Sequence, residues 1–555
     1  MNNTVNTQKR SSKNLFFSGV LILTIANILV KSVGLISKIA LNRVVGSIGA
    51  GYYSSAYEIY AFLYVISTAG LPVAISIMVS KARARGSLEE ANKIFNISFK
   101  VFSTVGLVLT GLMVVFSNEI AELMGAPETS VCIRTIAPTL LFICISSCIR
   151  GYFQGYQLMG PTAVSQLIEA VCKVGIGISL AFFAKSRGYS DNIVASYTVF
   201  GVTVGVFLGM VYLYIKKHRF KEYEYFDTVD DTSNNSSRFL MKNLMRIAIP
   251  ITISSSVLSL TTILDTFMIQ NRLLNYGMDI TTIRVYYGDY TSLVISMFNL
   301  PTILIYPIAN ALVPMISASA ESGDSTGAER IRELGIRLVS IISIPCAMGM
   351  SVFSFPILRL LMFKQDSVYR ASPWLSVSAI SVVFLGIIAI TNAYLNSEGK
   401  QGLPIISMLC GSSVKLLLSY ILIGKIGIIG APIGTLLCYA TASFINLYFV
   451  LRHIGKLPSP MDALVMPFSC SAICIGAAVA VYSVFENYLP PSLVTLIAIL
   501  VASLVYFITV IKSGTVAREE IYFLPSGKKH NSITGKILYF KKKIGNYIQK
   551  KLQKK

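Results

Sequence analysis

Long apolar segments follow one another from residue 15 to residue 511, and they constrain the fold more than any other feature of this chain. Each has at least the roughly 20 residues that an α-helix needs to cross a bilayer. Mean hydropathy is +0.66, and 13% of the residues are charged, against about 25% in ordinary soluble domains. The sequence therefore predicts an all-α integral membrane protein with about 14 transmembrane helices. We expect the spans at residues 15–42, 51–81, 92–116, 132–156, 161–184, 193–215, 243–272, 284–318, 332–353, 372–396, 402–424, 427–451, 461–485 and 489–511.

The formal charge of +22 is unevenly distributed. Basic residues gather in segments 1–14, 81–93 and 216–221 and in the C-terminal tail, whereas the loop after the third span carries Glu119 and Glu122. By the positive-inside rule we expect a multi-pass protein of the cytoplasmic membrane with both termini in the cytoplasm. We expect no nucleic-acid partner, because no basic soluble domain is present to bind one.

A polar linker divides the spans into six, then six, then two. Its segment DTVDDTSNNSS has no hydrophobic periodicity. The expected parts are a cytoplasmic N-tail at 1–14, an N-lobe at 15–215, the cytoplasmic linker at 216–242, a C-lobe at 243–451, two further helices at 452–511 and a basic tail at 512–555.

The two six-span lobes look like repeats of each other. A shift of 242 residues aligns Tyr152 with Tyr394 and Lys173 with Lys415, with no gap. Since six is even, both lobes enter the membrane with the same polarity. Their pseudo-symmetry axis should run along the membrane normal, with a substrate site between the lobes near the midplane.

Basic residues occur inside the first apolar span. Lys31 and Lys38 lie two helical turns apart, so both point to nearly the same side of one helix. A charge at membrane depth costs roughly 3 kcal/mol on insertion scales. We expect Lys31 to line a wet cavity that receives an anion, the alternative being a side chain that snorkels to the surface, as we expect for Arg43 at the end of the span.

Lys173 and Lys415 are further candidate cavity bases. Glu169 precedes Lys173 by four residues, which is the favourable acid-then-base order on a helix. The two residues form either a neutralised pair or a cavity base with a charge-setting acid. In the second lobe Gly411 replaces the acid, so Lys415 needs water, a partner on another helix or an anionic ligand.

Asp265 is a carboxylate within the seventh span. It either binds a coupling proton or Na⁺, or it pairs with a lysine of the first lobe. Glu58 and Asp289 are closer to helix ends, where a carboxylate can reach water.

Prolines interrupt spans two and eight. Pro72, Pro301 and Pro307 remove backbone hydrogen bonds, so they are either packing features or bending points for alternating access. Asn310, in the same proline-rich span, is a candidate cavity-lining group.

No catalytic site, metal site or cofactor site is predicted. The chain has no P-loop, its nine cysteines lie in apolar segments, and its three histidines lie in loops or the tail. Energy for any transport would therefore come from a Na⁺ or H⁺ gradient, from the membrane potential or from the substrate's own downhill use. The tail, ending ITGKILYFKKKIGNYIQKKLQKK, reads either as an amphipathic helix on anionic inner-leaflet lipids or as a disordered basic segment.

The segment RGYFQGYQLMGPTAVSQLIEAVCKVG at 150–175 strongly resembles the stage V sporulation protein B family. The segment GLPVAIS at 70–76 and the span-one pattern of Lys31, Gly34, Lys38 and Arg43 match it too. That family is similar to the lipid II flippases and polysaccharide exporters of the superfamily that includes MATE drug exporters. In this alignment Lys31 matches a cavity arginine of the flippases, while Ser37 and Lys38 replace their arginine–aspartate pair.

The resemblance implies two six-helix lobes around a central basic cavity, and two extra helices that shape a groove for a lipid tail. It also implies a flippase, not an enzyme, for an undecaprenyl-diphosphate-linked wall precursor. We expect it to act without a cofactor, alongside cell-wall synthesis proteins, in spore cortex formation. A cation-coupled multidrug antiporter, which would need an acidic cavity, is one alternative. The other is a non-transporting scaffold for wall synthesis, whose cavity charges could be neutralised without loss of function.

Overall fold

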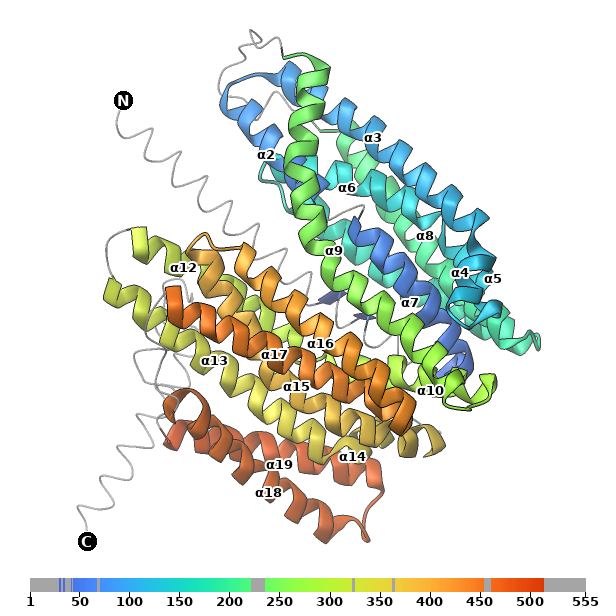
Figure 1. Ribbon diagram of the computed structural model, residues 1–555, viewed down its shortest axis with the longest axis vertical. Helices are drawn as coiled ribbons and strands as arrows, with labels where there is room; N and C mark the ends of the chain where they lie inside the picture. Colours follow the sequence, from blue (N-terminus) through green and yellow to red (C-terminus); the bar gives the residue numbers. More distant parts are fainter. Residues whose placement is uncertain are drawn as a thin grey trace.

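The computed structural model describes residues 29–30, 33–34, 41, 43–66, 70–220, 235–321, 325–361, 365–453 and 461–513. Within these residues the chain is helical (Figure 1). The first half comprises helical residues 43–66, α2 (Leu71–Ala84), α3 (Leu88–Val115), α4 (Ser117–Leu123), η1 (Pro127–Thr129), α5 (Ser130–Ile136), α6 (Thr139–Gly155), α7 (Gly160–Ser186) and α8 (Asp191–His218).

The second half begins with the long helix α9. Its elements are α9 (Ser237–Asn275), α10 (Ile280–Asp289), η3 (Tyr290–Val294), α11 (Ile295–Phe298), α12 (Thr302–Glu321), α13 (Ser325–Val352), α14 (Ser354–Leu361), α15 (Gln365–Ser397), α16 (Gly402–Ile426), η4 (Gly427–Ile429), α17 (Gly430–His453), η5 (Met461–Val465), α18 (Met466–Phe485) and α19 (Pro491–Lys512).

Ten helices of the described chain are long and apolar enough to cross a membrane. The number is 11 if the bent pair Ile280–Phe298 and Thr302–Ala309 counts as one span. That count takes α16 and α17 together as Gly402–His453. Every expected span after the first coincides with one helix or a consecutive set of helices, so the all-α membrane fold is confirmed. The first span, the linker core and the basic tail lie largely outside the described residues.

Local chemistry explains several helix ends. Ser87 caps α3 by accepting a hydrogen bond from the backbone N–H of Glu90, and Asp279 caps α10 in the same way through Thr282. Hydrogen bonds from Thr281 and Thr282 hold the pKa of Asp279 well below its usual range. Gly427 has a φ of +69° and ends α16 in a conformation that a side chain would strain.

The N-lobe is formed by residues 43–66, α2, α3, α6, α7 and α8. The helices α7 and α8 pack along each other, and α6 packs against α2, α3 and α8. Buried apolar side chains from these helices form two continuous clusters that hold the lobe together.

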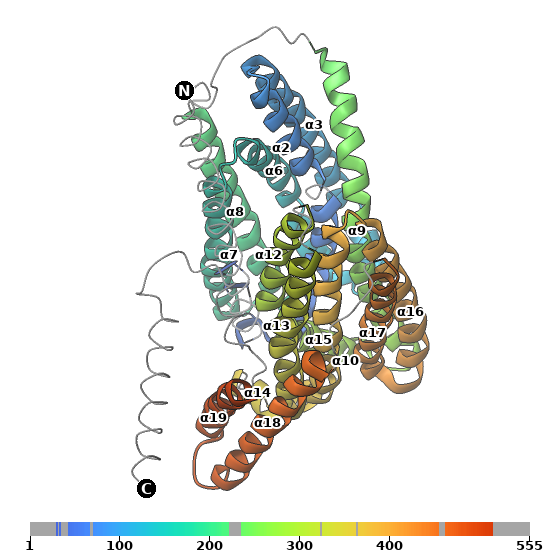
Figure 2. The same cartoon turned by 90° about the vertical axis from the view of Figure 1, so that its left-hand side faces the viewer.

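The C-lobe is formed by α10 to α17. In it α15 packs centrally against α12, α13 and α17, and α16 packs along α17. The last two helices, α18 and α19, pack on each other and on α13 and α14, at the edge of the C-lobe away from the N-lobe (Figures 1 and 2).

Helix α9 belongs to both lobes. Leu240 and Leu244 near its start lie in an N-lobe cluster, whereas Ile269 and Leu273 near its end lie in the C-lobe cluster. Figure 1 shows α9 running beside α2 and α3 and reaching α10. We expected the lobe boundary in the linker that precedes α9. The first part of α9, after that linker, nevertheless packs in the N-lobe.

Candidate functional site

Lys173 lies at the centre of a membrane-spanning helix. It is 13 residues from each end of α7, or about 20 Å from either end of the helix. Its side chain is half-buried, and its Nζ lies 4.2 Å from the centroid of the Tyr57 ring. Tyr53 is a second phenol near the ammonium group. These neighbours hold the ammonium group in place but do not neutralise its charge.

Glu169 does not pair with Lys173, and the local pair expected from the sequence is wrong. Its carboxylate forms an ion pair with Arg150 of α6. The Arg150 Nε also donates to Ser165 Oγ at 3.0 Å, and the arginine side chain is 6% exposed. A guanidinium can hold two oxygens at once in a fixed geometry, which explains why Arg150 takes the carboxylate. Gly209 of α8 leaves room for this pair, because a Cβ there would lie 2.8 Å from Glu169 Oε1.

Asp265 and Lys415 form an ion pair between α9 and α16. Each side chain is 14% exposed, and Lys415 lies 13 residues after the start of α16. Of the three ways in which Lys415 could be satisfied (water, a partner on another helix or an anionic ligand), the structure shows the partner on another helix. The alternative in which Asp265 pairs with a lysine of the first lobe is not seen in the described residues, where its partner is Lys415 of the second lobe.

The lobes meet through a polar cluster at the end where α7 stops and α8 starts. Ser47 Oγ donates to Asp289 Oδ1 at 2.5 Å, and Arg370 holds Asp289 Oδ2 through Nε at 3.0 Å and Nη2 at 2.8 Å. The Asp289 side chain is fully buried, so the expectation that it reaches water is wrong. A carboxylate can be buried here because a guanidinium and a hydroxyl satisfy it.

This cluster also marks the pseudo-symmetry axis. Ser47 and Asp289 are 242 residues apart, which is the shift that relates Lys173 to Lys415. Equivalent positions of two repeats touch each other only where their symmetry axis passes. The axis therefore runs through this contact between the lobes.

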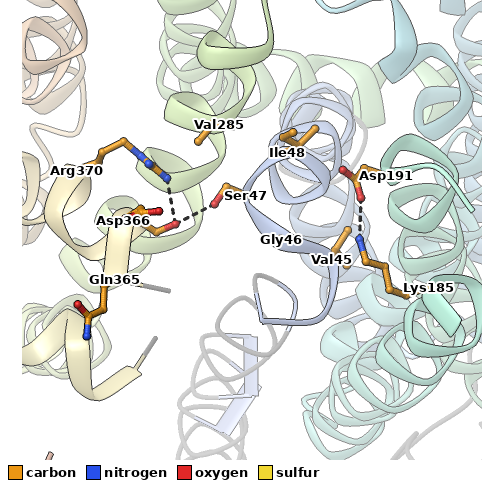
Figure 3. Close-up of a pocket in the computed structure, with 11 residues that line it drawn as sticks. Val45, Gly46, Ser47, Ile48, Lys185, Asp191, Val285, Gln365, Asp366 and Arg370 are labelled. Carbon is orange, nitrogen blue, oxygen red and sulfur yellow. Dashed lines mark hydrogen bonds and ion pairs between the residues drawn. The ribbon is translucent and has the colours of Figure 1, made fainter. Parts of the chain in front are cut away.

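A pocket of about 670 Å³ opens beside this contact (Figure 3). Lys185 and Asp191 form one wall and are paired at 3.0 Å. Ser47 and Arg370 stand on the opposite side, with the exposed Asp366 next to them. The pocket takes residues from both lobes, so its shape depends on how the lobes sit against each other.

Other polar contacts join the lobes at the same end. They are Gln270 Nε2 to Ser55 Oγ at 3.2 Å, Thr291 Oγ1 to Ser54 Oγ at 3.0 Å, Asn271 Nδ2 to the Leu123 carbonyl at 2.9 Å, and the ion pair of Arg284 with Glu128. Such hydroxyl and amide contacts bury little apolar area. They are typical of an interface that can separate.

The structure assigns no role to three of the predicted site residues. Lys31 and Lys38 lie outside the described residues. Glu58 is half-buried in helical residues 43–66 and has interactions of its own.

The predicted kink residues fall at helix breaks or inside a helix. Pro72 lies in the first turn of α2, two residues after the N-cap residue Gly70. Pro301 lies between α11 and α12, where the chain bends by 43°. Pro307 lies inside α12. Asn310 is also on α12, with its side chain outside the described part.

The sequence analysis did not identify Arg150, Asp289 or Arg370 as site residues. Arg150 could have been found, because it is a basic residue inside an apolar span, as Lys31 and Lys173 are. The tyrosines around Lys173 gave no such signal, since aromatic residues are common throughout membrane helices.

Comparison with known families agrees with this geometry. Residues 16–320 match the model described as polysaccharide biosynthesis protein, which covers more than half of the chain. The chain belongs to the polysaccharide biosynthesis protein family. Residues 290–421 also match the MatE model.

Two relatives from Bacillus subtilis (strain 168) are similar to this family member. Stage V sporulation protein B is 27% identical over 59% of this chain and 63% of its own length, which is less than two thirds. Lipid II flippase MurJ is 24% identical over 73% of this chain and 77% of its own length.

A solved structure, "Lipid II flippase MurJ, inward closed conformation", has the same fold. It matches with a TM-score of 0.67 and 19% identity, over 90% of this chain and 100% of that one. The family member described here is therefore a multi-span membrane protein with the fold of that structure.

Proposed function

We propose that this chain is a flippase. It moves a lipid II-like, undecaprenyl-diphosphate-linked wall precursor across the cytoplasmic membrane by alternating access, in spore cortex peptidoglycan synthesis. The names of the two Bacillus subtilis relatives and the fold shared with the MurJ structure support this proposal.

The observation that carries it is the environment of Lys173. A half-buried ammonium group at the middle of a membrane span, beside phenols rather than a carboxylate, is costly when no anion is near. A diphosphate would remove that cost and gain charge-assisted hydrogen bonds. The head group would sit near Lys173 while the polyprenyl tail remains in lipid.

The lobe contacts fit alternating access. The described polar contacts between Ser47, Asp289 and Arg370 close the lobes at the end where α7 meets α8. By the positive-inside rule this end faces outward, and both termini face the cytoplasm. The structure then corresponds to a state that is closed to the outside, which opens when the polar contacts separate.

A reconstituted flipping assay tests the proposal. Liposomes containing the protein receive lipid II, a teichoic-type precursor or no substrate. Lys173→Ala should lower flipping at least tenfold, because a charge-assisted hydrogen bond is worth about 1.5–3 kcal/mol. Lys173→Arg should keep most of the activity.

Lys93→Ala is the matched control, since Lys93 pairs with Glu89 on the helix surface. Removing Lys173 leaves no acid stranded, because Glu169 is held by Arg150. Equal flipping by wild type and Lys173→Ala, at equal expression, would refute the diphosphate role of this lysine.

The MatE match at residues 290–421 favours a second candidate, a cation-coupled multidrug antiporter. It predicts transport of organic cations that responds to a Na⁺ or H⁺ gradient and no flipping of any precursor.

We also propose that the basic tail at 512–555 binds anionic inner-leaflet lipids and that wall-synthesis proteins act with the transporter. Truncation after residue 513 should then weaken binding to anionic vesicles.

A further inference from the structure

The ion pair of Asp265 and Lys415 lies at membrane depth and at the junction of the lobes. Asp265 is 10 residues before the end of α9. Two residues earlier on the same helix, Ile263 packs into an N-lobe cluster, whereas Asp265 itself pairs with a C-lobe helix. A change in how the lobes meet therefore acts directly on this pair.

The carboxylate of Asp265 is only half satisfied. One oxygen, Oδ2, takes the Lys415 ammonium, while Oδ1 is buried and accepts no hydrogen bond from the described residues. A buried carboxylate oxygen without a donor is costly while the group is ionised. Protonation would reduce that cost by removing the negative charge.

The two repeat-related lysines have different neighbours. Lys173 is surrounded by phenols, and Lys415 by a carboxylate. Gly411, which stands where Glu169 stands in the first lobe, packs against α17, and a Cβ there would lie 2.6 Å from the Cys438 carbonyl. The acid of the second lobe must therefore come from another helix, where it can be separated from its base.

Resting on the flippase function proposed above, we propose that Asp265 is a replaceable counter-ion. The diphosphate of the lipid-linked substrate replaces Asp265 as the ion-pair partner of Lys415. The freed Asp265 carboxylate then binds one proton from water. The charges balance: a neutral pair becomes a lysine–phosphate pair and a neutral carboxylic acid. Substrate binding is thereby coupled to the uptake of one proton.

The groups around Asp265 favour this exchange. Lys415 from α16 is the cation that faces it, and Tyr287, Tyr290 and Tyr439, from α10, η3 and α17, are uncharged at neutral pH. Cys438 from α17 and, beyond Tyr287, Glu58 from residues 43–66 complete the described surroundings. None of these groups supplies a second positive charge, so a proton is the simplest replacement for Lys415.

Binding of undecaprenyl diphosphate to the purified full-length protein tests the proposal, with the uncharged alcohol undecaprenol as the reference ligand. Proton uptake is measured at pH 7 in weakly buffered detergent with a pH-indicator dye. Wild type should take up about one more proton per bound diphosphate than Asp265→Asn does. Asp265→Asn should bind the diphosphate about tenfold more tightly, because Lys415 no longer has a competing acid. Glu398→Gln, which removes a carboxylate paired with Arg332 at a helix end, should behave as wild type.

A wild-type measurement keeps the test independent of how the variant folds. Adding undecaprenyl diphosphate should produce the infrared C=O band of a protonated carboxylic acid, and undecaprenol should not. Equal proton uptake by wild type and Asp265→Asn, or no such band in wild type, would overturn the exchange.

The remaining outcomes separate the proposals. Binding that needs Na⁺, with no proton uptake, would overturn the proton in favour of a metal cation. If wild type binds undecaprenyl diphosphate no better than undecaprenol, the proposed function itself fails. If binding is selective for the diphosphate but proton uptake does not depend on Asp265, only the exchange fails.

Discussion

Gly288 controls how closely the two lobes approach each other. It lies on α10 against residues 43–66, beside the Ser47–Asp289 hydrogen bond. A Cβ at this position would lie 2.8 Å from the Ser47 carbonyl carbon and 3.1 Å from the Gly51 amide nitrogen, and still closer to the Ser47 oxygen. All three atoms belong to the backbone, so no side-chain rotation can relieve the overlap.

The size of the effect follows from these distances. Carbon atoms pack best about 3.5–4.0 Å apart, and the Cβ would overlap most with the Ser47 carbonyl oxygen, so Gly288→Ala must move the two helices apart by more than about 1 Å. Overpacking of this kind costs about 1–3 kcal/mol. The cost falls on the state in which the lobes touch at this end, so we expect that state to lose about five- to 150-fold in population relative to the separated state.

Double electron–electron resonance measures this shift. Spin labels replace Lys185 and Gln365, which line opposite sides of the pocket, in a background without the nine native cysteines. Gly288→Ala should add a longer-distance population. Gly111→Ala is the matched control, since a Cβ on this exposed α3 glycine meets nothing within 4 Å. Identical distance distributions for Gly288→Ala and wild type, in well-folded protein, would refute the reasoning.

Three further results are expected. Lys415→Met should lower the free energy of unfolding by about 3–5 kcal/mol by leaving Asp265 buried and unpaired, and adding Asp265→Asn should restore most of it in a thermal double-mutant cycle. Arg150→Met should lower the free energy of unfolding by a similar amount, because it leaves Glu169 buried without its partner. The double variant Arg150→Met with Glu169→Leu should have a melting temperature near that of wild type. Additive losses of stability would show that the pair is not coupled. A single cysteine at Ser233 should resist membrane-impermeant maleimide added outside intact cells, and rapid labelling would invert the topology.

The helices could be predicted from the sequence because apolar length alone decides which segments cross a bilayer. The need of Lys415 for a partner was also predictable, since its neighbour at position 411 is glycine. Which acid would serve was not, because the register of α9 against α16 is set by packing of the whole lobe. For the same reason local spacing gave Glu169 the wrong base, since Arg150 reaches it from a neighbouring helix. Asp289 looked water-exposed because a sequence does not show that the symmetry axis passes through it.

Helix α9 is 39 residues long, so it measures about 58 Å. It packs into the N-lobe near its start and into the C-lobe near its end. A tilt of about 10° at one end would carry the other end through about 10 Å. A small rotation at the end where the lobes are in contact would thus produce a large displacement at the opposite end of α9. Pro250 lies 13 residues after the start of α9. It has no backbone N–H to donate, so we expect α9 to bend there. The size of this movement would then be set by the stiffness of one helix rather than by the strength of any one contact.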